Sequence, residues 1–309
     1  MNTPTGRVIV SAAALSIALA ATGCSTAPTP DGSGELAGAS LIVGSKEFTE
    51  QLVLGQITAL ALENAGATIT DETGLTGSAT VREALVRGEL DIYWDYTGTG
   101  WVNILGNTPS DLPDDLYGAV SEADAKNGIA WLEPANFENT YRIATSEQFA
   151  SEHGIETMSD VAAYVKAHPT DGKVCAASEF IARDDGLPGV EHAYDFAFSE
   201  IVELDFNLIY TQIGDTCSFG EVFSTDARIP ANSLRVITDD LGFFVEYLGA
   251  VTLRQETLDT YPAIADIFAP IAEALTIPTI TALNGKVDIE GEDPRDVAEE
   301  WLLAEGFIG

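Results

Sequence analysis

The sequence predicts an α/β fold organised in two lobes. Strand-like and helix-like segments alternate in the order β-α-β-α-β between residues 41 and 96, which implies a parallel sheet with right-handed crossovers. The same alternation returns less regularly between residues 158 and 237, and amphipathic helices fill the tail. We therefore expect two α/β lobes, the first of them completed by the C-terminal helices.

The first lobe opens with a strand, a helix and a second strand. The strand is the apolar run 41–43, and Thr49 is positioned to cap the helix that follows. That helix is expected to run to about Asn64, because Gly66 then stops it. The second strand covers residues 67–70. The order of these elements is that of one β-α-β unit.

A second helix and a third strand complete this pattern. Thr80 and Glu83 have the spacing of a capping box, which predicts a helix from Thr80 to Arg87 with Gly88 behind it. The run Leu90–Trp94 is expected to be a buried strand. The remaining predicted elements are helices over 158–168, 191–198, 256–259 and onward, 263–275 and 294–305, strands over 173–176 and 234–237, and a strand or buried segment over 208–213.

The first candidate site follows the strand 90–94, in the stretch DYTGTG (95–100). Open α/β sheets place ligands at the carboxyl ends of their strands. The two glycines allow the backbone to approach a bound molecule, Tyr96 offers an aromatic face and Thr99 a hydroxyl. The stretch is interpreted either as part of a ligand site or as an ordinary strand-to-loop turn with a core tyrosine.

The charge balance excludes some classes of partner. The chain has 14 Lys+Arg and 49 Asp+Glu, a formal net charge of −35. Nucleic acid and anionic lipid surfaces would be repelled by such a field. A cationic ligand is favoured by it, whereas an anionic group must be met by specifically placed basic residues.

The amino terminus has the pattern of an export signal. Arg7 is followed by an apolar run from Val8 to Ala21, long enough for a signal peptide and shorter than the roughly 20 residues of a membrane span. The run ends in Ala-Thr-Gly-Cys, which resembles a bacterial lipobox. We expect residues 1–23 to be a signal peptide and Cys24 to be the lipidated first residue of the mature protein. Plain secretion, with cleavage after residues 18–20, is the alternative.

Residues 24–39 are rich in Ser, Thr, Pro and Gly, which predicts a flexible linker behind the lipid anchor. Two further cysteines remain in the exported body, Cys175 and Cys217. An even number of cysteines in an exported protein is consistent with one disulfide. We favour this pairing over two free thiols.

The sequence contains no pattern that requires an enzyme or a cofactor. The three histidines are His153, His168 and His192, and none lies near a nucleophile motif or a metal-ligand spacing. A glycine-rich phosphate loop is also missing from the sequence. More informative are aromatic residues that follow extended segments, together with two basic residues in similar places. They are Tyr96, Tyr141, Phe223 and Tyr247, and Lys46 and Arg183.

Six motifs, taken in chain order, span nearly all of residues 41–262. They are GSKEFTEQ (44–51), GLTGSATVREAL-x-x-GELDIYWDYTGTG (74–100), NTYRIA (139–144), RDDGLPG (183–189), FSTDARI (223–229) and DDLGFF-x-x-Y (239–247). Together they resemble the osmoprotectant-binding proteins of ABC importers, which take up glycine betaine, choline and carnitine. The resemblance implies a two-lobed, periplasmic-binding-protein-like fold of type II. The ligand, a quaternary ammonium compound, would then lie in the interlobe cleft.

The resemblance also implies roles for particular residues. Tyr96, Tyr141 and Tyr247 would be walls of an aromatic cage, and Asn139 would supply a polar contact to it. Phe223 stands where the family has a tyrosine, so that it keeps the aromatic face and loses a hydroxyl. The ligand carboxylate would be clamped by Lys46, Thr99 and Arg183.

On this basis lobe I is expected to comprise residues 40–142 and 241–309, and lobe II residues 143–240. The protein would be a monomeric, lipid-anchored extracytoplasmic binding protein that delivers its ligand to an ABC permease and its ATPase. A preference for choline or carnitine is one alternative. A sensory or structural lipoprotein without a transport role is another.

Overall fold

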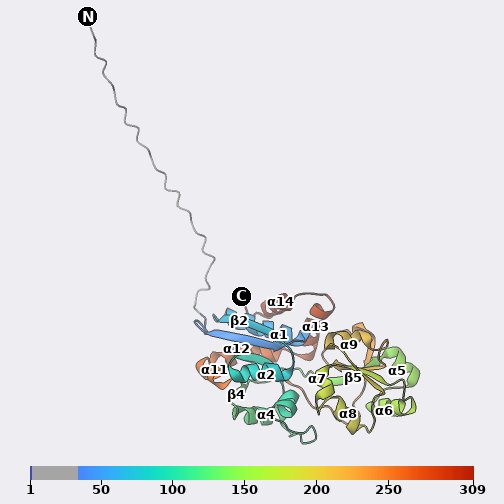
Figure 1. Cartoon of the computed structure of the whole chain (residues 1–309). Coiled ribbons are helices and arrows are strands. Elements are labelled where there is room, and N and C mark those ends of the chain that lie inside the picture. Colours follow the sequence, from blue (N-terminus) through green and yellow to red (C-terminus); the bar gives the residue numbers. More distant parts are fainter. Residues whose placement is uncertain (2–33) are drawn as a thin grey trace. The chain divides into compact units, whose positions relative to one another are not determined.

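The computed structural model describes Met1 and residues 34–309. The predicted signal peptide, Cys24 and most of the linker lie outside the described residues. The unit Gly32–Gly309 contains two five-stranded sheets, each covered by helices (Figure 1). In the described part of the chain, none of the helices combines the length and the apolar character needed to cross a bilayer.

The sheet of lobe I has the strand order β2-β1-β3-β10-β4. Its strands are β1 (Ser40–Lys46), β2 (Thr68–Leu75), β3 (Ile92–Tyr96), β4 (Ile129–Trp131) and β10 (Gly249–Arg254). Strand β1 runs parallel to β2 and β3, which confirms the parallel sheet predicted for this region. Strand β10 was not predicted; it returns from lobe II and pairs antiparallel with both β3 and β4.

Helices from both ends of the chain cover this sheet. They are α1 (Thr49–Asn64), α2 (Ser78–Arg87), α3 (Thr97–Thr99), the π-helical turn η1 (Gly100–Ile104), α4 (Leu116–Ala125), α11 (Gln255–Thr260), α12 (Ala263–Ala274), α13 (Ile277–Asp288) and α14 (Pro294–Glu305). Helix α1 packs against α12, α13 and α14. The C-terminal helices therefore lie against the first helix of lobe I (Figure 1).

Two predicted helix starts are wrong in detail. Thr49 does not cap α1: the N-cap position is Phe48, and the Thr49 hydroxyl instead donates to Asp288 at 2.6 Å. Helix α2 begins at Ser78, behind Gly77, so that Thr80 lies inside its first turn. A capping pattern considers only neighbouring residues. Here the Thr49 hydroxyl bonds to a residue that is distant along the chain, and Thr80 lies inside the helix instead of at its start.

The sheet of lobe II has the order β7-β6-β8-β5-β9. Its strands are β5 (Tyr141–Ser146), β6 (Lys173–Ala176), β7 (Glu200–Glu203), β8 (Phe219–Phe223) and β9 (Leu234–Val236). Its helices are α5 (Glu147–His153), α6 (Met158–Ala167), α7 (Ser178–Ala182), α8 (Leu187–Ala193), α9 (Phe206–Gln212) and α10 (Arg228–Ala231). Strand β6 is parallel to β7 and β8, while β5 is antiparallel to β8 and β9.

Two predictions for this lobe are corrected by the structure. The strand or buried segment expected at 208–213 is mostly helix α9, which Asp205 caps by accepting a bond from the Asn207 N–H at 2.9 Å. The helix expected at 191–198 is α8, which starts earlier and leaves helical geometry near Asp195, whose φ is +53°. In both cases a local turn or cap outweighs the apolar pattern of the segment.

The chain crosses between the sheets twice, and the two crossing segments run side by side. Glu138 and Leu248 form a bridge, and the Asn139 N–H donates to the Tyr247 carbonyl at 2.9 Å. Tyr141 already belongs to β5, so residues 141 and 142 lie in the second sheet and not in lobe I, where the sequence analysis placed them. The crossings thus bring Asn139 and Tyr247 to the junction of the lobes.

The structure joins Cys175 and Cys217 in a disulfide, with 5.7 Å between their Cα atoms. Cys175 lies in β6 and Cys217 just before β8, so the bond ties the ends of two neighbouring strands. Both residues are buried in a cluster with Tyr210 and Ile213 of the α9 region. A covalent link at this place ties two elements of the lobe II core together and reduces the conformational entropy of the unfolded chain.

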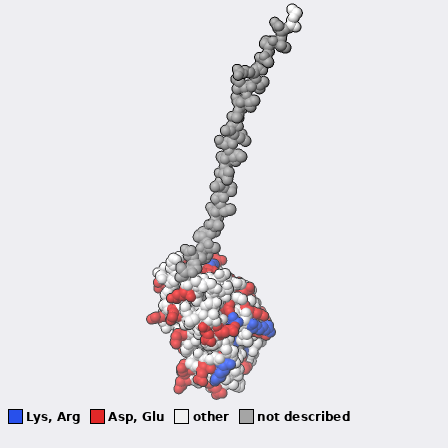
Figure 2. All heavy atoms as spheres, turned by 90° about the vertical axis from the view of Figure 1, so that its left-hand side faces the viewer, with Lys and Arg blue, Asp and Glu red and all other residues white. Residues whose placement is uncertain are grey.

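On the face of the molecule shown in Figure 2, Asp and Glu cover more of the surface than Lys and Arg, in keeping with the net charge of −35. Self-repulsion in such a surface destabilises the compact state.

We expect the melting temperature to rise when NaCl is raised from about 0.1 M to about 1 M, which shortens the Debye length from about 10 Å to about 3 Å. Each kcal/mol gained corresponds to roughly 2–4 °C. Thermal unfolding followed by circular dichroism measures this, KCl should act like NaCl, and a salt-independent melting temperature would contradict it.

Candidate functional site

A cavity of about 160 Å³ lies where the two lobes meet. Strands β1 and β3 of lobe I and β6 and β8 of lobe II reach it with their carboxyl ends, as expected for a ligand site in α/β sheets. Seven of the eight predicted ligand-binding residues line this cavity, and Arg183 does not. The seven are Lys46, Tyr96, Thr99, Asn139, Tyr141, Phe223 and Tyr247.

Aromatic rings from both lobes come together at the cavity. The ring centroid of Tyr141 lies 5.0 Å from that of Phe223 and 5.4 Å from that of Tyr247. Phe48 connects the remaining ring, at 5.0 Å from Phe223 and 6.3 Å from Tyr96. Segments far apart in the sequence thus build one continuous group of rings around a single small space.

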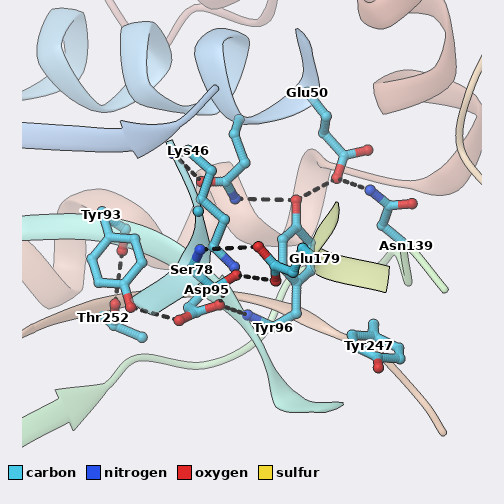
Figure 3. A network of polar contacts seen from close by, with 12 residues as sticks. Lys46, Glu50, Ser78, Tyr93, Asp95, Tyr96, Asn139, Glu179, Tyr247 and Thr252 are labelled. Carbon is cyan, nitrogen blue, oxygen red and sulfur yellow. Dashed lines mark hydrogen bonds and ion pairs between the residues drawn. The ribbon is translucent and has the colours of Figure 1, made fainter. Parts of the chain in front are cut away.

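Tyr96 is held in place by polar contacts at its hydroxyl, as Figure 3 shows. The hydroxyl donates to Glu50 Oε1 at 2.6 Å and accepts from Gln51 Nε2 at 3.1 Å. Both partners lie in the first turn of α1, next to its N-cap residue Phe48, which lines the cavity. Because β3 ends at Tyr96, the strand and the helix together determine where this ring points.

The carboxylate of Glu50 connects elements of both lobes. Besides Tyr96, it accepts bonds from Asn139 Nδ2 at 2.9 Å, from the Thr225 hydroxyl at 2.6 Å and from Asn284 Nδ2 at 3.3 Å. Burial raises the pKa of Glu50, and these four donors only partly offset it. The sequence analysis did not identify Glu50 as part of the site, although it lies within the motif GSKEFTEQ.

Tyr247 is positioned by the crossing segment and by lobe II. Its hydroxyl donates to Asp185 Oδ2 and lies 3.2 Å from an Arg183 nitrogen that donates to it. Its ring packs on the backbone of Gly98, where an added Cβ would lie 2.6 Å from a ring carbon. Glycine at this position therefore permits the close approach of Tyr247 to α3.

The two predicted basic ligands are already paired inside the protein. Lys46 Nζ lies 2.7 Å from Asp95 Oδ1, and both side chains are buried (Figure 3). Arg183 lies behind the cavity wall, where it packs over the rings of Tyr141 and Tyr247. Its guanidinium makes two bonds to Asp185, at 2.7 and 2.8 Å. Arg183 was expected to contact a ligand carboxylate, but in the structure it lies outside the cavity and is bonded to Asp185.

The sequence analysis missed other lining residues, and four of them matter most for the aromatic and buried acidic parts of the wall. They are Phe48, Glu179, Phe206 and Glu221. The ring of Phe206 lies 4.3 Å from that of Phe223 and enlarges the aromatic wall. Phe48 lies in the motif GSKEFTEQ, and Glu179 lies just before the motif RDDGLPG. Phe206 and Glu221 lie in helix α9 and strand β8, which the sequence analysis did not predict.

The pKa values of Glu179 and Glu221 are shifted in opposite directions. Glu179 of α7 accepts bonds from the N–H and hydroxyl of Ser78, at 3.1 and 2.7 Å, and so joins lobe II to lobe I (Figure 3). Burial opposes its ionisation, but the charges of Lys46 and Arg183 and the Ser78 bonds prevail and lower its pKa to about 2. Burial, helped by the charge of Glu179, raises the pKa of Glu221 to about 8.

This geometry defines the class of protein. Two α/β lobes, joined by two crossing segments around one small ligand-sized cavity, are the architecture of periplasmic substrate-binding proteins. The solved structure of apo YehZ from Escherichia coli matches with a TM-score of 0.61 and 30% sequence identity, covering 87% of this chain and 99% of that one. The two-lobed fold predicted from the sequence is confirmed.

The family follows from the sequence match. The family model described as the substrate binding domain of the ABC-type glycine betaine transport system matches residues 39–304, and this chain belongs to that family. The family serves transport and is not a family of enzymes. The resemblance drawn from the six motifs is thereby confirmed.

Two curated relatives illustrate the family. A glycine-betaine-binding protein of Pseudomonas aeruginosa is 36% identical over 272 residues, which cover 85% of this chain and 87% of that protein. An ergothioneine transport permease/ergothioneine binding protein of Helicobacter pylori is 33% identical over 264 residues, 85% of this chain. This chain spans 47% of the length of that second relative.

Proposed function

We propose that this protein captures glycine betaine or a related quaternary ammonium compound in the interlobe cavity and delivers it to the permease of an ABC importer. The observation that carries the proposal is the convergence of Tyr96, Tyr141, Phe223 and Tyr247, with Phe48 and Phe206, on one cavity. The family match supports the transport role. The joint name of the Helicobacter pylori relative, permease and binding protein, supports the partnership with a permease.

The chemistry of the ligand explains why rings are needed. A trimethylammonium group has no N–H to donate, so its natural receptor is a set of electron-rich ring faces, each worth roughly 0.5–2 kcal/mol. Micromolar binding requires about 8 kcal/mol. One ring cannot supply this, whereas several rings in a desolvated cavity supply most of it.

Contacts between the lobes would couple ligand binding to closure. Glu179 of lobe II bonds to Ser78 of lobe I in the wall of the cavity, and Glu50 of lobe I bonds to Thr225 of lobe II. A ligand that touches rings of both lobes stabilises the closed arrangement in which these bonds form, because it binds that arrangement more tightly.

A ligand panel tests the proposal. In thermal-shift measurements, glycine betaine, choline, carnitine and ergothioneine should raise the melting temperature, whereas proline, which has no quaternary nitrogen, should raise it less. Stabilisation by none of these compounds would refute the proposal. It would favour instead a sensory or structural lipoprotein without a transport role.

Removal of one ring should weaken binding measurably. We expect Tyr96→Ala to reduce the affinity for the best ligand of the panel by roughly 10–30-fold, the contribution of one ring. Tyr96→Phe is the matched control, since it keeps the ring and removes only the hydroxyl that bonds to Glu50. Isothermal titration calorimetry compares the three proteins, and unchanged affinity in Tyr96→Ala would exclude this ring from the site.

The amino-terminal pattern supports an extracytoplasmic location with a lipid anchor at Cys24. Metabolic labelling with a fatty acid tests this part of the proposal, because Cys24→Ala should abolish the incorporated label. Label retained by that variant would place the modification elsewhere.

A further inference from the structure

Beyond the rings, the wall of the cavity is acidic. Four acidic residues line it, and among the described lining residues Lys46 is the only basic one. The four are Glu47, Glu179, Asp205 and Glu221. Glu221 is 1% exposed and lies in β8 two residues before Phe223, so both side chains project from the same face of the strand. The acidic part of the wall is therefore adjacent to the aromatic part.

The cations near the cavity are neutralised before any ligand arrives. Lys46 is paired with Asp95, and Arg183 makes bonds to both Asp185 and Glu179. Buried charges paired in this way are costly to separate. A ligand carboxylate would have to break one of these pairs, and it would also approach the ionised Glu179.

Three polar side chains at the cavity carry hydrogen-bond acceptors. Asn139 donates its Nδ2 to Glu50, which leaves its Oδ1 buried and without a partner in the described structure. Glu221 accepts the Ala177 N–H through one oxygen, at 2.7 Å. Glu179 is about a third exposed, and it lines the cavity while bonded to Ser78. A ligand group that donates a hydrogen bond matches these atoms, since a buried acceptor left alone is unfavourable.

We propose that Glu179, Glu221 and Asn139 form a second subsite that selects quaternary ammonium ligands with a hydroxyl group and no carboxylate, that is, amino alcohols of the choline type. This inference rests on the function proposed above and narrows it. The rings hold the methylated nitrogen, and the ligand hydroxyl donates to a carboxylate in a charge-assisted hydrogen bond. The carboxylate clamp implied by the family resemblance is replaced here by an acidic wall.

The selectivity should depend on pH through Glu221. The charged and titratable groups that influence it are Glu179, Arg183 and Tyr141. With its pKa raised to about 8, Glu221 is a neutral carboxyl group at pH 7, able to donate to a ligand carboxylate, and it becomes an anion above pH 8. Raising the pH therefore favours the amino alcohol and disfavours the zwitterion.

Calorimetry with choline and glycine betaine tests this inference. At pH 9, choline should bind at least about 10-fold more tightly than glycine betaine, and the ratio should be smaller at pH 6.5. Glu179→Gln should shift the ratio of the two affinities toward glycine betaine by roughly 10–100-fold, the range for a hydrogen bond to a charged group, whatever loss both ligands share through the Ser78 contact. Glu221→Gln should remove the pH dependence of the ratio, and the exposed Glu203→Gln is the control for a charge change outside the cavity.

Each outcome has a separate meaning. Glycine betaine bound as tightly as choline at pH 9 would overturn the inference and leave the proposed function standing. An equal loss for both ligands in Glu179→Gln would also overturn it, because it would assign this residue to lobe closure through Ser78. If the wild-type protein binds neither ligand, nor any other quaternary ammonium compound of the panel, the proposed function itself fails.

Discussion

Glu221→Gln is expected to stabilise the folded protein at alkaline pH. The ordinary pKa of a glutamate is about 4.5, and burial raises that of Glu221 to about 8. Between these values the folded state holds a proton that the unfolded state has lost. The free energy of unfolding therefore falls as the pH rises from about 4.5 to about 8, and this contribution is constant above that window. The whole effect is on the order of 4–5 kcal/mol.

Glutamine keeps an oxygen that can accept the Ala177 N–H and carries no titrating group, so Glu221→Gln should lose this part of the pH dependence. Urea denaturation at pH 5, 7 and 9 measures it for both proteins. The gain of the variant over the wild type should be small at pH 5 and largest at pH 9. The exposed Glu203→Gln should follow the wild type, and equal pH profiles for Glu221→Gln and the wild type would show that Glu221 ionises normally.

Asp185→Ala is expected to destabilise the protein by about 3–5 kcal/mol, the range for breaking a buried ion pair from one side. Asp185 makes two bonds to the Arg183 guanidinium, and the side chains are 1% and 3% exposed. Its loss would leave a buried guanidinium with only Glu179 as an ionic partner, and the Tyr247 hydroxyl would lose its acceptor. Ligand affinity should fall as well, because Tyr247 would no longer be held in the cavity wall.

The neighbouring Asp184→Ala is a matched control, since Asp184 is exposed. Urea denaturation at pH 7 should place it within about 0.5 kcal/mol of the wild type. The double variant Arg183→Met/Asp185→Leu should recover much of the lost stability, because an apolar pair of similar volume replaces the ion pair. A cost below about 1 kcal/mol for Asp185→Ala would contradict the structural role assigned to this pair.

Much of the fold could be predicted from local patterns. The alternation of apolar strands and helices between residues 41 and 96 predicted three parallel strands, and all three are present. The errors lie where local signals compete with tertiary contacts, as at Thr49, whose hydroxyl contacts Asp288, and at α9, where a cap outweighs an apolar run. Strand β10 was missed because it belongs to a sheet whose other strands lie more than 100 residues earlier.

The candidate site was predictable to the extent that its residues end strands or stand in motifs. Tyr96 ends β3, Phe223 ends β8, and Tyr141 and Tyr247 lie in motifs of the family; all four line the cavity. The acidic residues of the wall could not be singled out in a chain with 49 Asp and Glu, because no local feature separates a buried glutamate from a solvated one. Glu221 differs from Glu203 only in what surrounds it.

By itself, the sequence determined the family, the two-lobed α/β fold and four of the six aromatic residues that meet at the cavity. The tertiary structure alone decided which charges remain available to a ligand. Lys46 is paired with Asp95, 49 positions away, and Glu50 bonds to Thr225, 175 positions away. A charge is available or neutralised according to its burial and its partners, and both depend on contacts between segments that are distant along the chain.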